Sequence, residues 1–490
     1  MPKKSFVSRA EDKWTINDFP QMDRDKLARR LPPITATHFY NLHSCPTRVY
    51  LDMHGDHYKR LPLSEFLRQK IAEGVEHERS VLSGLPDLTH IDYETDQEGL
   101  HKTLDAMRAG ASIISQGVLV HEGMVGRPDL LIRDEGVSIF GPYQYYACDI
   151  KSGRSVKFAY QLQVAFYSDL LGKTQGTVPT RAGVILHDGK ERRVDLLRVR
   201  QRFEEAKQHI TSIRDGVKDH PHLCAACKEC GWRAVCKEEL LGSGDLSLIN
   251  GLSREYRAAY YNIGIKDITE LSQSAVKPSR ISQRVADNFR VQARSLIEHS
   301  PVLIHKIELP SSQSIIYFDI EGETEQKIYY LLGCLLVQDG VTTYHPFFAE
   351  KPSDERQMWN AFLTWIKTIP DFHIIHYHNY EKYALAGLRR KYGCPDELYK
   401  TISSHMTDLF KLVKDSIAFP IHSYSIKDLA KSIGFCWRSD TPGGAQSLYW
   451  YAIWAKTGDA SIKEALLHYN EDDCQAMKHV VEHIQNSFNT

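Results

Sequence analysis

The chain has 490 residues, and at roughly 150 residues per domain this length predicts about three domains. Its 42% apolar and 25% charged residues exclude a disordered or collagen-like chain. The 61 basic and 62 acidic residues leave a net charge of -1, so bulk charge gives no sign of a nucleic-acid or membrane partner. Neither a signal peptide nor a membrane span is visible, and we expect a soluble cytoplasmic protein without a membrane partner.

A first region, residues 1–240, has the order helix, strand, strand, helix. Residues 64–84 carry apolar side chains at helical spacing behind a serine that can cap a helix. Residues 124–133 and 143–150 have the apolar and β-branched or aromatic composition of strands, and residues 158–171 predict a second long helix. The region closes with a cluster of cysteines.

A polar connector, residues 241–310, is expected to be mostly helical. Two short helices around an Ile-Gly-Ile turn at 263–265 resemble a helix-hairpin-helix element, although a plain solvated helical surface explains the same pattern. From residue 311 to 490 the pattern changes to strands and then helices, which predicts a mixed α/β domain. The expected strands of this third region are 314–322, 327–337, 342–349 and 372–378.

Three polar side chains converge at the ends of the two expected strands of the first region. Asp129 lies in the segment Gly126–Asp129, and Asp149 and Lys151 lie two residues apart at the end of the next strand. Residues two apart on a strand share a face, and strand pairing would bring Asp129 alongside. Two converging carboxylates repel each other unless a cation lies between them, and a divalent metal is the usual one. Such a metal can activate water against a phosphodiester, while the lysine orients or stabilises the nucleophile.

These residues, in this order, resemble the PD-(D/E)xK nucleases, in particular the RecB-like branch that includes the CRISPR-associated iron-sulfur exonucleases. The resemblance covers residues 35–240 and adds two helical motifs. It implies that His77, in the motif GVEHE, supplies a metal ligand, and that Gln163 and Tyr167, one turn apart on a helix, contact the substrate strand. Asp149 stands where the family more often has Glu. An Asp-x-Lys tripeptide alone also occurs by chance at the exposed end of a strand. The nuclease interpretation therefore depends on all of these motifs occurring together.

Five of the ten cysteines suggest a metal site rather than disulfides, the usual preference in a cytosolic chain. Cys227, Cys230 and Cys236, with the remote Cys45, resemble the pattern of the same nuclease branch. There, four thiolates hold a 4Fe-4S cluster that fastens the two ends of the domain together. The resemblance therefore implies a structural cluster on these four residues. Alternatively, Cys224 and its three neighbours hold zinc, because four thiolates in a tetrahedron suit zinc equally.

A second acidic motif lies in the third region. Asp319 and Glu321 share a face at the end of a strand, and Tyr469 and Asp473 are one helical turn apart. Three acids and a phenol of this kind can hold two divalent ions, orient an attacking water and stabilise the leaving oxygen. The pair of motifs D-x-E and Y-x-x-x-D resembles the DnaQ-like DEDD exonucleases of the RNase H-like fold, tyrosine subtype, over residues 312–485.

The middle motif of that family departs from its usual form here. The resemblance places Glu381 as the fourth acid and Tyr377 where the family has Asn, with Asp408 in a later Asp-containing segment. A degenerate RNase H-like domain kept only for binding is the alternative. The retained acids argue against it, since three carboxylates without metal only destabilise one another.

The sequence therefore predicts an α/β protein with a restriction-endonuclease-like nuclease domain and an RNase H-like exonuclease domain, joined by a helical connector. This combination resembles a bacterial family of RecB-like nucleases. It implies Mg²⁺- or Mn²⁺-dependent hydrolysis of phosphodiesters, in DNA rather than RNA, for repair, recombination or defence, with a separate helicase as a candidate partner. Two alternatives stay open: an RNA exonuclease whose first domain only grips substrate, and a non-catalytic nucleic-acid adaptor for a helicase.

Overall fold

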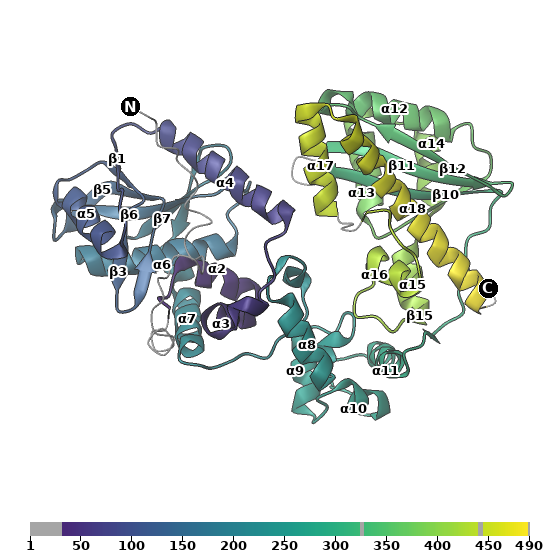
Figure 1. Ribbon diagram of the computed structural model, residues 1–490, viewed down its shortest axis with the longest axis horizontal. Helices are drawn as coiled ribbons and strands as arrows, with labels where there is room; N and C mark the ends of the chain where they lie inside the picture. The colour runs from purple at the N-terminus through teal and green to yellow at the C-terminus, as the bar shows by residue number, and fades with distance from the viewer. Residues whose placement is uncertain (1–31, 324–327, 440–443, 489–490) are drawn as a thin grey trace. The chain divides into compact units, whose positions relative to one another are not determined.

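The computed structural model describes residues 32–323, 328–439 and 444–488 (Figure 1). It divides into two compact units, one up to residue 237 and one from residue 238. The N-terminal stretch in which we expect no signal peptide lies outside the described residues, as does residue 327, where an expected strand begins. In the described part of the chain, no helix has the length and apolar character needed to cross a membrane.

Strands of the first unit form a mixed sheet in the order β1-β2-β5-β6-β7-β8. β1 pairs with β2 and β6 with β7 in parallel, whereas the other neighbours are antiparallel. β3 and β4 form a separate hairpin. The strands are β1 (Leu88–His90), β2 (Ile113–Ser115), β3 (Leu119–His121), β4 (Met124–Gly126), β5 (Leu130–Ser138), β6 (Gly141–Ile150), β7 (Arg181–Ile185) and β8 (Glu191–Asp195).

The single strand expected over residues 124–133 is wrong, because the structure divides it into β4 and β5. Pro128 lies in the break between them. A proline has no amide hydrogen to donate to a strand ladder, so the chain leaves one sheet before it and joins the other after it. The break releases Asp129 from regular pairing at the entrance to β5.

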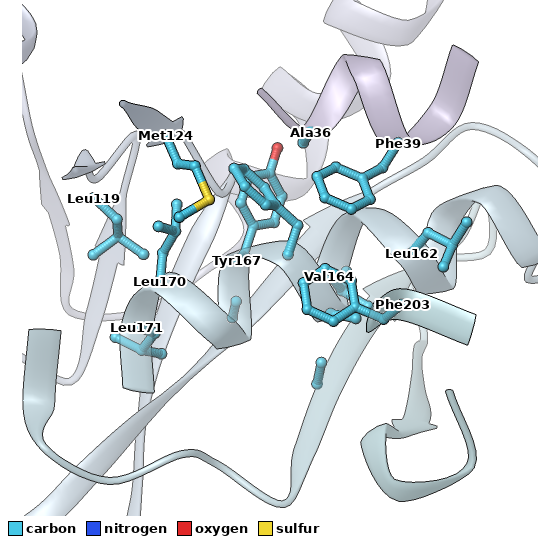
Figure 2. Packing of buried hydrophobic residues seen from close by; sticks show 14 of the residues in the cluster. Ala36, Phe39, Leu119, Met124, Leu162, Val164, Tyr167, Leu170, Leu171 and Phe203 are labelled. Carbon is cyan, nitrogen blue, oxygen red and sulfur yellow. The ribbon is translucent and has the colours of Figure 1, made fainter. Parts of the chain in front are cut away.

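Helices pack on both faces of this sheet. They are α2 (Ala36–Ser44), α3 (Pro46–His54), α4 (Glu65–Ser83), α5 (Asp96–Arg108), α6 (Phe158–Gln175) and α7 (Leu196–Arg214). The two helices expected from the sequence are α4, whose first turn is capped by Ser64 Oγ at 3.2 Å from Leu67 N, and α6. Figure 2 shows side chains of α2, α6 and α7 interleaved in one core, with Phe39, Phe203 and Tyr167 among them.

The side chains of β6 alternate between two cores, as a strand buried on both faces requires. Tyr145 and Ala147 pack in the core that contains α6, whereas Tyr146 and Cys148 pack in the core that includes residues of α4. Asp149 continues the first series, so the strand directs this buried carboxylate toward the α6 side of the sheet.

The second unit is built on a sheet in the order β12-β11-β10-β13-β14. β10, β11 and β12 form an antiparallel meander, and β13 and β14 follow β10 in parallel. Its strands are β10 (Ser314–Glu323), β11 (Ile328–Gln338), β12 (Val341–Phe348), β13 (Phe372–His376) and β14 (Met406–Asp408). The four strands expected in this region are thus present, apart from the undescribed residue 327.

Helices cover both faces of this sheet. They are α12 (Glu355–Ile366), α13 (Tyr380–Tyr392), α14 (Asp396–Ser404), α15 (Leu409–Ser416), α16 (Ile426–Ser432), α17 (Gly444–Thr457) and α18 (Ala460–Phe488). In β10, Ile316, Phe318 and Ile320 pack with α12 and α13, whereas Tyr317 packs in the core of α15, α16 and α18. Asp319 and Glu321 continue the second series, on the face crossed by the long α18 helix (Figure 1).

The connector residues pack within the second unit. They form the end of α8 (Arg233–Ser243), a helix that begins before the connector, and all of α9 (Arg254–Asn262), α10 (Ile268–Gln273) and α11 (Gln283–Glu298). β9 (Val302–Leu303) pairs with β15 (Ile417–Ala418), and Ser295 Oγ donates to Ala418 O at 2.9 Å. α9 and α10 are the two short helices expected around the turn at 263–265.

Candidate active sites

The first acidic centre lies where β5 begins and β6 ends. Asp129 Oδ2 accepts a hydrogen bond from Ile150 N at 2.6 Å, and Lys151 Nζ lies 2.5 Å from Asp149 Oδ2. Asp149 is 1% exposed, and the Lys151 side chain is about a quarter exposed at 24%. The structure thus brings together the three residues that strand alternation and pairing placed at one point.

The charged side chains of this centre shift one another's pKa values. Burial, and then the neighbouring Asp149 carboxylate, raise the pKa of Asp129 well above its usual range, and Lys151 opposes this only in part. Burial works against the charge on Lys151, yet the Asp149 and Asp129 carboxylates raise the pKa of its ammonium. Two buried carboxylates that repel each other are a suitable set of oxygen ligands for a divalent cation, which would neutralise both.

Glu78 is a third acid at this centre that the sequence motifs did not single out. The side-chain Nε2 of Gln116 donates to Glu78 Oε1 at 2.6 Å, and the backbone N of Gln116 donates to the backbone O of Asp129 at 3.2 Å. The charge of Glu78 accordingly contributes to the raised pKa of Asp129. The available signal was the motif GVEHE itself, in which Glu78 directly follows His77. His77 Nε2 is enclosed and has no hydrogen-bond partner among the described residues.

Gln163 and Tyr167 lie on one face of α6, but that face is buried. The two residues are 8% and 7% exposed, and Tyr167 packs in the core drawn in Figure 2. A Cβ at Gly126 would stand only 3.1 Å from the Tyr167 ring. Burial and the charges of Asp149 and Asp129 raise the pKa of Tyr167, so its hydroxyl lies beside the acidic centre rather than on an open surface.

The second acidic centre is more compact. Asp319 and Glu321 from β10 and Asp473 from α18 each bring a carboxylate oxygen within 4.8 Å of the others. Among the described residues, this is the one group of three acidic, histidine or cysteine side chains gathered so closely. Burial and mutual repulsion raise the pKa values of Asp319 and Glu321 well above their usual range.

Each carboxylate of this centre is oriented by one neutral donor. Asn470 Nδ2 donates to Asp319 Oδ2 at 2.7 Å, Ser447 Oγ to Glu321 Oε2 at 2.5 Å, and Trp437 Nε1 to Asp473 Oδ1 at 2.7 Å. A carboxylate has about four lone-pair positions, so these donors leave acceptor capacity on every acid. The three side chains are therefore fixed in place and still able to ligate a cation.

Tyr469 and Lys427 complete the centre. Lys427 Nζ donates to the Tyr469 hydroxyl at 2.6 Å and lies 3.2 Å from Asp473 Oδ2. Burial and the charges of Asp473 and Glu321 raise the pKa of Tyr469. Tyr469 and Asp473 are one turn apart on α18, but Lys427 comes from α16, and no motif in the sequence connects it with them.

Glu381 stands close to this centre without joining the compact group. It is 3% exposed, its Oε2 has no hydrogen-bond partner in the described structure, and its charge raises the pKa of Asp319. Burial raises the pKa of Glu381 itself to about 8. His376 Nδ1 lies 3.5 Å from Glu381 Oε2. Asp408 instead caps α15 and accepts a hydrogen bond from His378 N at 2.9 Å.

The five cysteines singled out in the sequence line one pocket of the first unit. These residues are Cys45, Cys224, Cys227, Cys230 and Cys236. None of the ten cysteines, all of which lie in the described part of the chain, forms a disulfide. Cys224 Sγ and Cys227 Sγ are 3.9 Å apart, and this contact, with burial, raises the pKa of Cys227. The fold thus brings Cys45 to the other four across almost the whole length of the unit.

Hydrogen bonds fasten the N-terminal segments of the unit to the cysteine segment around this pocket. The buried Trp232 donates through Nε1 to Asp52 Oδ1 at 2.7 Å, and Leu61 N donates to Gly231 O at 2.8 Å. Ser64 Oγ donates to Glu229 Oε2 at 2.7 Å. The pocket is therefore held between the two ends of the domain.

Each unit presents buried carboxylates on a mixed sheet beneath a helix, an arrangement that suits metal-dependent hydrolases. Residues 38–237 match the family model of the PD-(D/E)XK nuclease superfamily, and residues 316–485 match a model of the RNase_H superfamily. The chain therefore contains a PD-(D/E)XK nuclease domain and an RNase H superfamily domain. These two domains support a metal-dependent nuclease that acts on nucleic acid. A search of the curated proteins finds no match.

Proposed function

We propose that the protein is a metal-dependent DNA exonuclease with two active centres, one in each domain. The observation that carries the proposal is the gathering of Asp319, Glu321 and Asp473 within 4.8 Å. The preference for DNA rests on the resemblance of the first domain to RecB-like nucleases. Such an enzyme would serve DNA repair, recombination or defence, and a separate helicase that delivers single strands is the partner that suits it.

In the second centre, the donor set fits a hard divalent cation, since three carboxylates with free lone pairs converge. Mg²⁺ or Mn²⁺ held there by Asp319, Glu321 and Asp473 would supply a Lewis acid at the scissile phosphate. The Tyr469 hydroxyl, beside Asp473, orients the attacking water. Asn470 and Trp437 keep the carboxylates aligned during turnover through the hydrogen bonds described above.

In the first centre, Asp129 and Asp149 are the proposed metal ligands, and Glu78 and His77 complete the set from α4. The enclosed His77 Nε2 without a hydrogen-bond partner fits this role. Lys151, held 2.5 Å from Asp149, places a positive charge where the attacked phosphate would enter. Because Gln163 and Tyr167 are buried, their proposed role is to support the floor of this centre beneath the substrate strand.

The cysteine pocket is proposed to hold a 4Fe-4S cluster on Cys45, Cys227, Cys230 and Cys236. When four thiolates bind one zinc ion in a tetrahedron, with Zn–S bonds of about 2.3 Å, their sulfur atoms lie about 3.8 Å from one another. Within the described residues, however, no three thiol sulfurs lie within 4.8 Å of one another. Cys224 Sγ and Cys227 Sγ lie 3.9 Å apart, so the choice of a cluster over zinc rests on the resemblance of Cys45, Cys227, Cys230 and Cys236 to the pattern of the iron-sulfur nucleases. The cluster would be structural, because the pocket joins the two ends of the domain.

Degradation of end-labelled single-stranded DNA tests the nuclease assignment. Wild-type protein should release nucleotides with Mn²⁺ and not with EDTA. Asp149→Ala or Lys151→Ala should remove one component of the activity, and the paired substitutions Asp319→Ala and Glu321→Ala the other. The exposed Glu397 provides a matched control, since Glu397→Ala removes a surface acid. The proposal fails if neither set of active-centre substitutions changes the rate.

A second candidate is an RNA exonuclease whose first domain only grips substrate. It is favoured by one observation: in the described residues, only the second centre brings three potential metal ligands within 4.8 Å. This candidate predicts that matched RNA strands are degraded faster than DNA, and that Asp149→Ala weakens binding without removing a separate hydrolytic activity. The same assay with both nucleic acids distinguishes the two functions.

A further inference from the structure

A lysine lies inside the second acidic centre, where metal-dependent hydrolysis calls for cations. Lys427 belongs to α16, and its side chain is 23% exposed. Its ammonium donates to the Tyr469 hydroxyl at 2.6 Å, lies 3.2 Å from Asp473 Oδ2 and stands 4.8 Å from the centroid of the Tyr469 ring. Its charge also lowers the pKa values of Asp319 and Glu321, against the burial that raises them. Lys427 therefore acts on every acid of the compact group.

The ammonium does not serve mainly to attach α16. Leu429 and Ala430 of the same helix are fully buried in the core that contains α18, so apolar burial already holds this helix in place without the ion pair. The position of the ammonium needs another explanation.

Charge and space at the centre supply that explanation. Asp319, Glu321 and Asp473 together carry three negative charges when ionised, and the Lys427 ammonium leaves a net charge of about -2, which one divalent cation neutralises. On the side of Asp473, Trp437 occupies Oδ1 and Lys427 faces Oδ2. A second divalent ion on that side would have to displace the ammonium.

We propose that Lys427 is a built-in second cation of this centre, so that the centre takes one divalent ion, and that Lys427 positions the Tyr469 hydroxyl for the attacking water. This inference rests on the proposed metal-dependent activity of the same centre and specifies how its charge is balanced. The Lys427 ammonium thus takes the place of a second, exchangeable metal ion.

Counting bound Mn²⁺ by electron paramagnetic resonance tests the proposal without an activity assay. The full-length holoprotein carrying Asp149→Ala is compared with the same protein carrying Asp319→Ala and Glu321→Ala in addition, and the difference counts the ions of the second centre. We expect a difference of one ion with Lys427 or with Lys427→Arg, and of two ions with Lys427→Met. A difference of two with Lys427 intact overturns the proposal, as does a difference of one in the Lys427→Met protein.

Kinetics provide the second readout, in the Asp149→Ala background. Lys427→Met should lower kcat about 10²-fold, because the Tyr469 hydroxyl loses the donor that positions it, with KM changed less than about twofold, and Lys427→Arg should recover part of kcat. Lys431, exposed on the same helix 5.9 Å from the Trp437 ring centroid, supplies the control Lys431→Met. Equal kcat in Lys427→Met and Lys431→Met overturns the positioning role. A wild-type protein that degrades no nucleic acid refutes the proposed function instead, while the ion count still tests Lys427.

Discussion

The close approach of α18 to the sheet at Gly333 makes the second centre sensitive to a single methyl group. Gly333 lies opposite Asp319 in the β10–β11 ladder. A Cβ at this position would stand 1.5 Å from Asn470 Oδ1 and 2.7 Å from its Cγ. Asn470 is fully buried, donates to Asp319 Oδ2 at 2.7 Å and accepts from the Tyr344 hydroxyl at 2.7 Å. Gly333→Ala must therefore push Asn470 away from both partners.

The expected cost follows from the two hydrogen bonds. In protein loaded with Mn²⁺, which keeps Asp319 ionised, the bond to this carboxylate is worth about 1.5 to 3 kcal/mol and the neutral bond to Tyr344 about 1 kcal/mol, which gives a loss of about 2 to 4 kcal/mol in the free energy of unfolding. For a unit of this size the corresponding fall in Tm is roughly 4 to 16 °C. Since Asp319 also loses its alignment, kcat of the second centre should fall about 10²-fold.

Thermal unfolding and Mn²⁺-dependent degradation, measured on the same preparations, check this prediction. Gly387→Ala is the matched control, because its Cβ would meet nothing closer than the Tyr329 hydroxyl at 3.6 Å, and an alanine in a helix is favoured over glycine by about 0.5 to 1 kcal/mol. Asn470→Ala combined with Gly333→Ala should cost less than the sum of the single changes, since the clash is gone. A Gly333→Ala protein with wild-type Tm and kcat would refute the reasoning.

Three further predictions follow from the electrostatics and the cysteines. Because burial raises the pKa of Glu381 from 4.5 to about 8, the folded protein keeps a proton that the unfolded chain releases between these pH values. Burial lowers the pKa of the neighbouring His376 to about 4, so this histidine opposes the effect below about pH 6.5 and not above it. The free energy of unfolding in EDTA should therefore fall in calorimetric scans from pH 7 to 8, by up to about 1.4 kcal/mol per pH unit, and a rise over that range would contradict it. Glu78→Gln should weaken Mn²⁺ binding at the first centre at least tenfold in a titration of protein whose second centre is disabled, and unchanged affinity would exclude Glu78 as a ligand. Cys45→Ser should abolish bound iron and acid-labile sulfide, whereas Cys224→Ser should retain both, and the opposite pattern or stoichiometric zinc would assign the pocket to a zinc site instead.

The strand-borne residues of both centres were predictable because their positions depend on local geometry. The two-residue period places Asp149 with Lys151, and Asp319 with Glu321, on common faces, and pairing of adjacent strands brings in Asp129. The four-residue spacing on a helix does the same for Tyr469 and its neighbour Asp473. The order of strands and helices predicted a mixed α/β domain from residue 311, whereas the two domain folds were predicted through the resemblance of the motifs to known nucleases.

The residues that were missed depend on packing between distant segments. Lys427 reaches the second centre from α16 only because α16 and α18 share a core, and no spacing in the sequence records that contact. Glu78 is brought to Asp129 by Gln116, a residue of the β2 region. Pro128 broke an expected strand through its missing amide hydrogen, a local signal that the apolar run around it concealed.

Two independent metal-dependent centres in one chain are tested most directly by one set of proteins assayed side by side: wild type, Asp149→Ala, the pair Asp319→Ala and Glu321→Ala, and all three substitutions together. The measured quantity is the rate of nucleotide release from end-labelled DNA with Mn²⁺. Each single-centre protein should retain part of the wild-type rate, and the combined protein should retain no more than wild type does in EDTA. Mn²⁺-dependent release that survives in the combined protein would contradict the assignment of both centres.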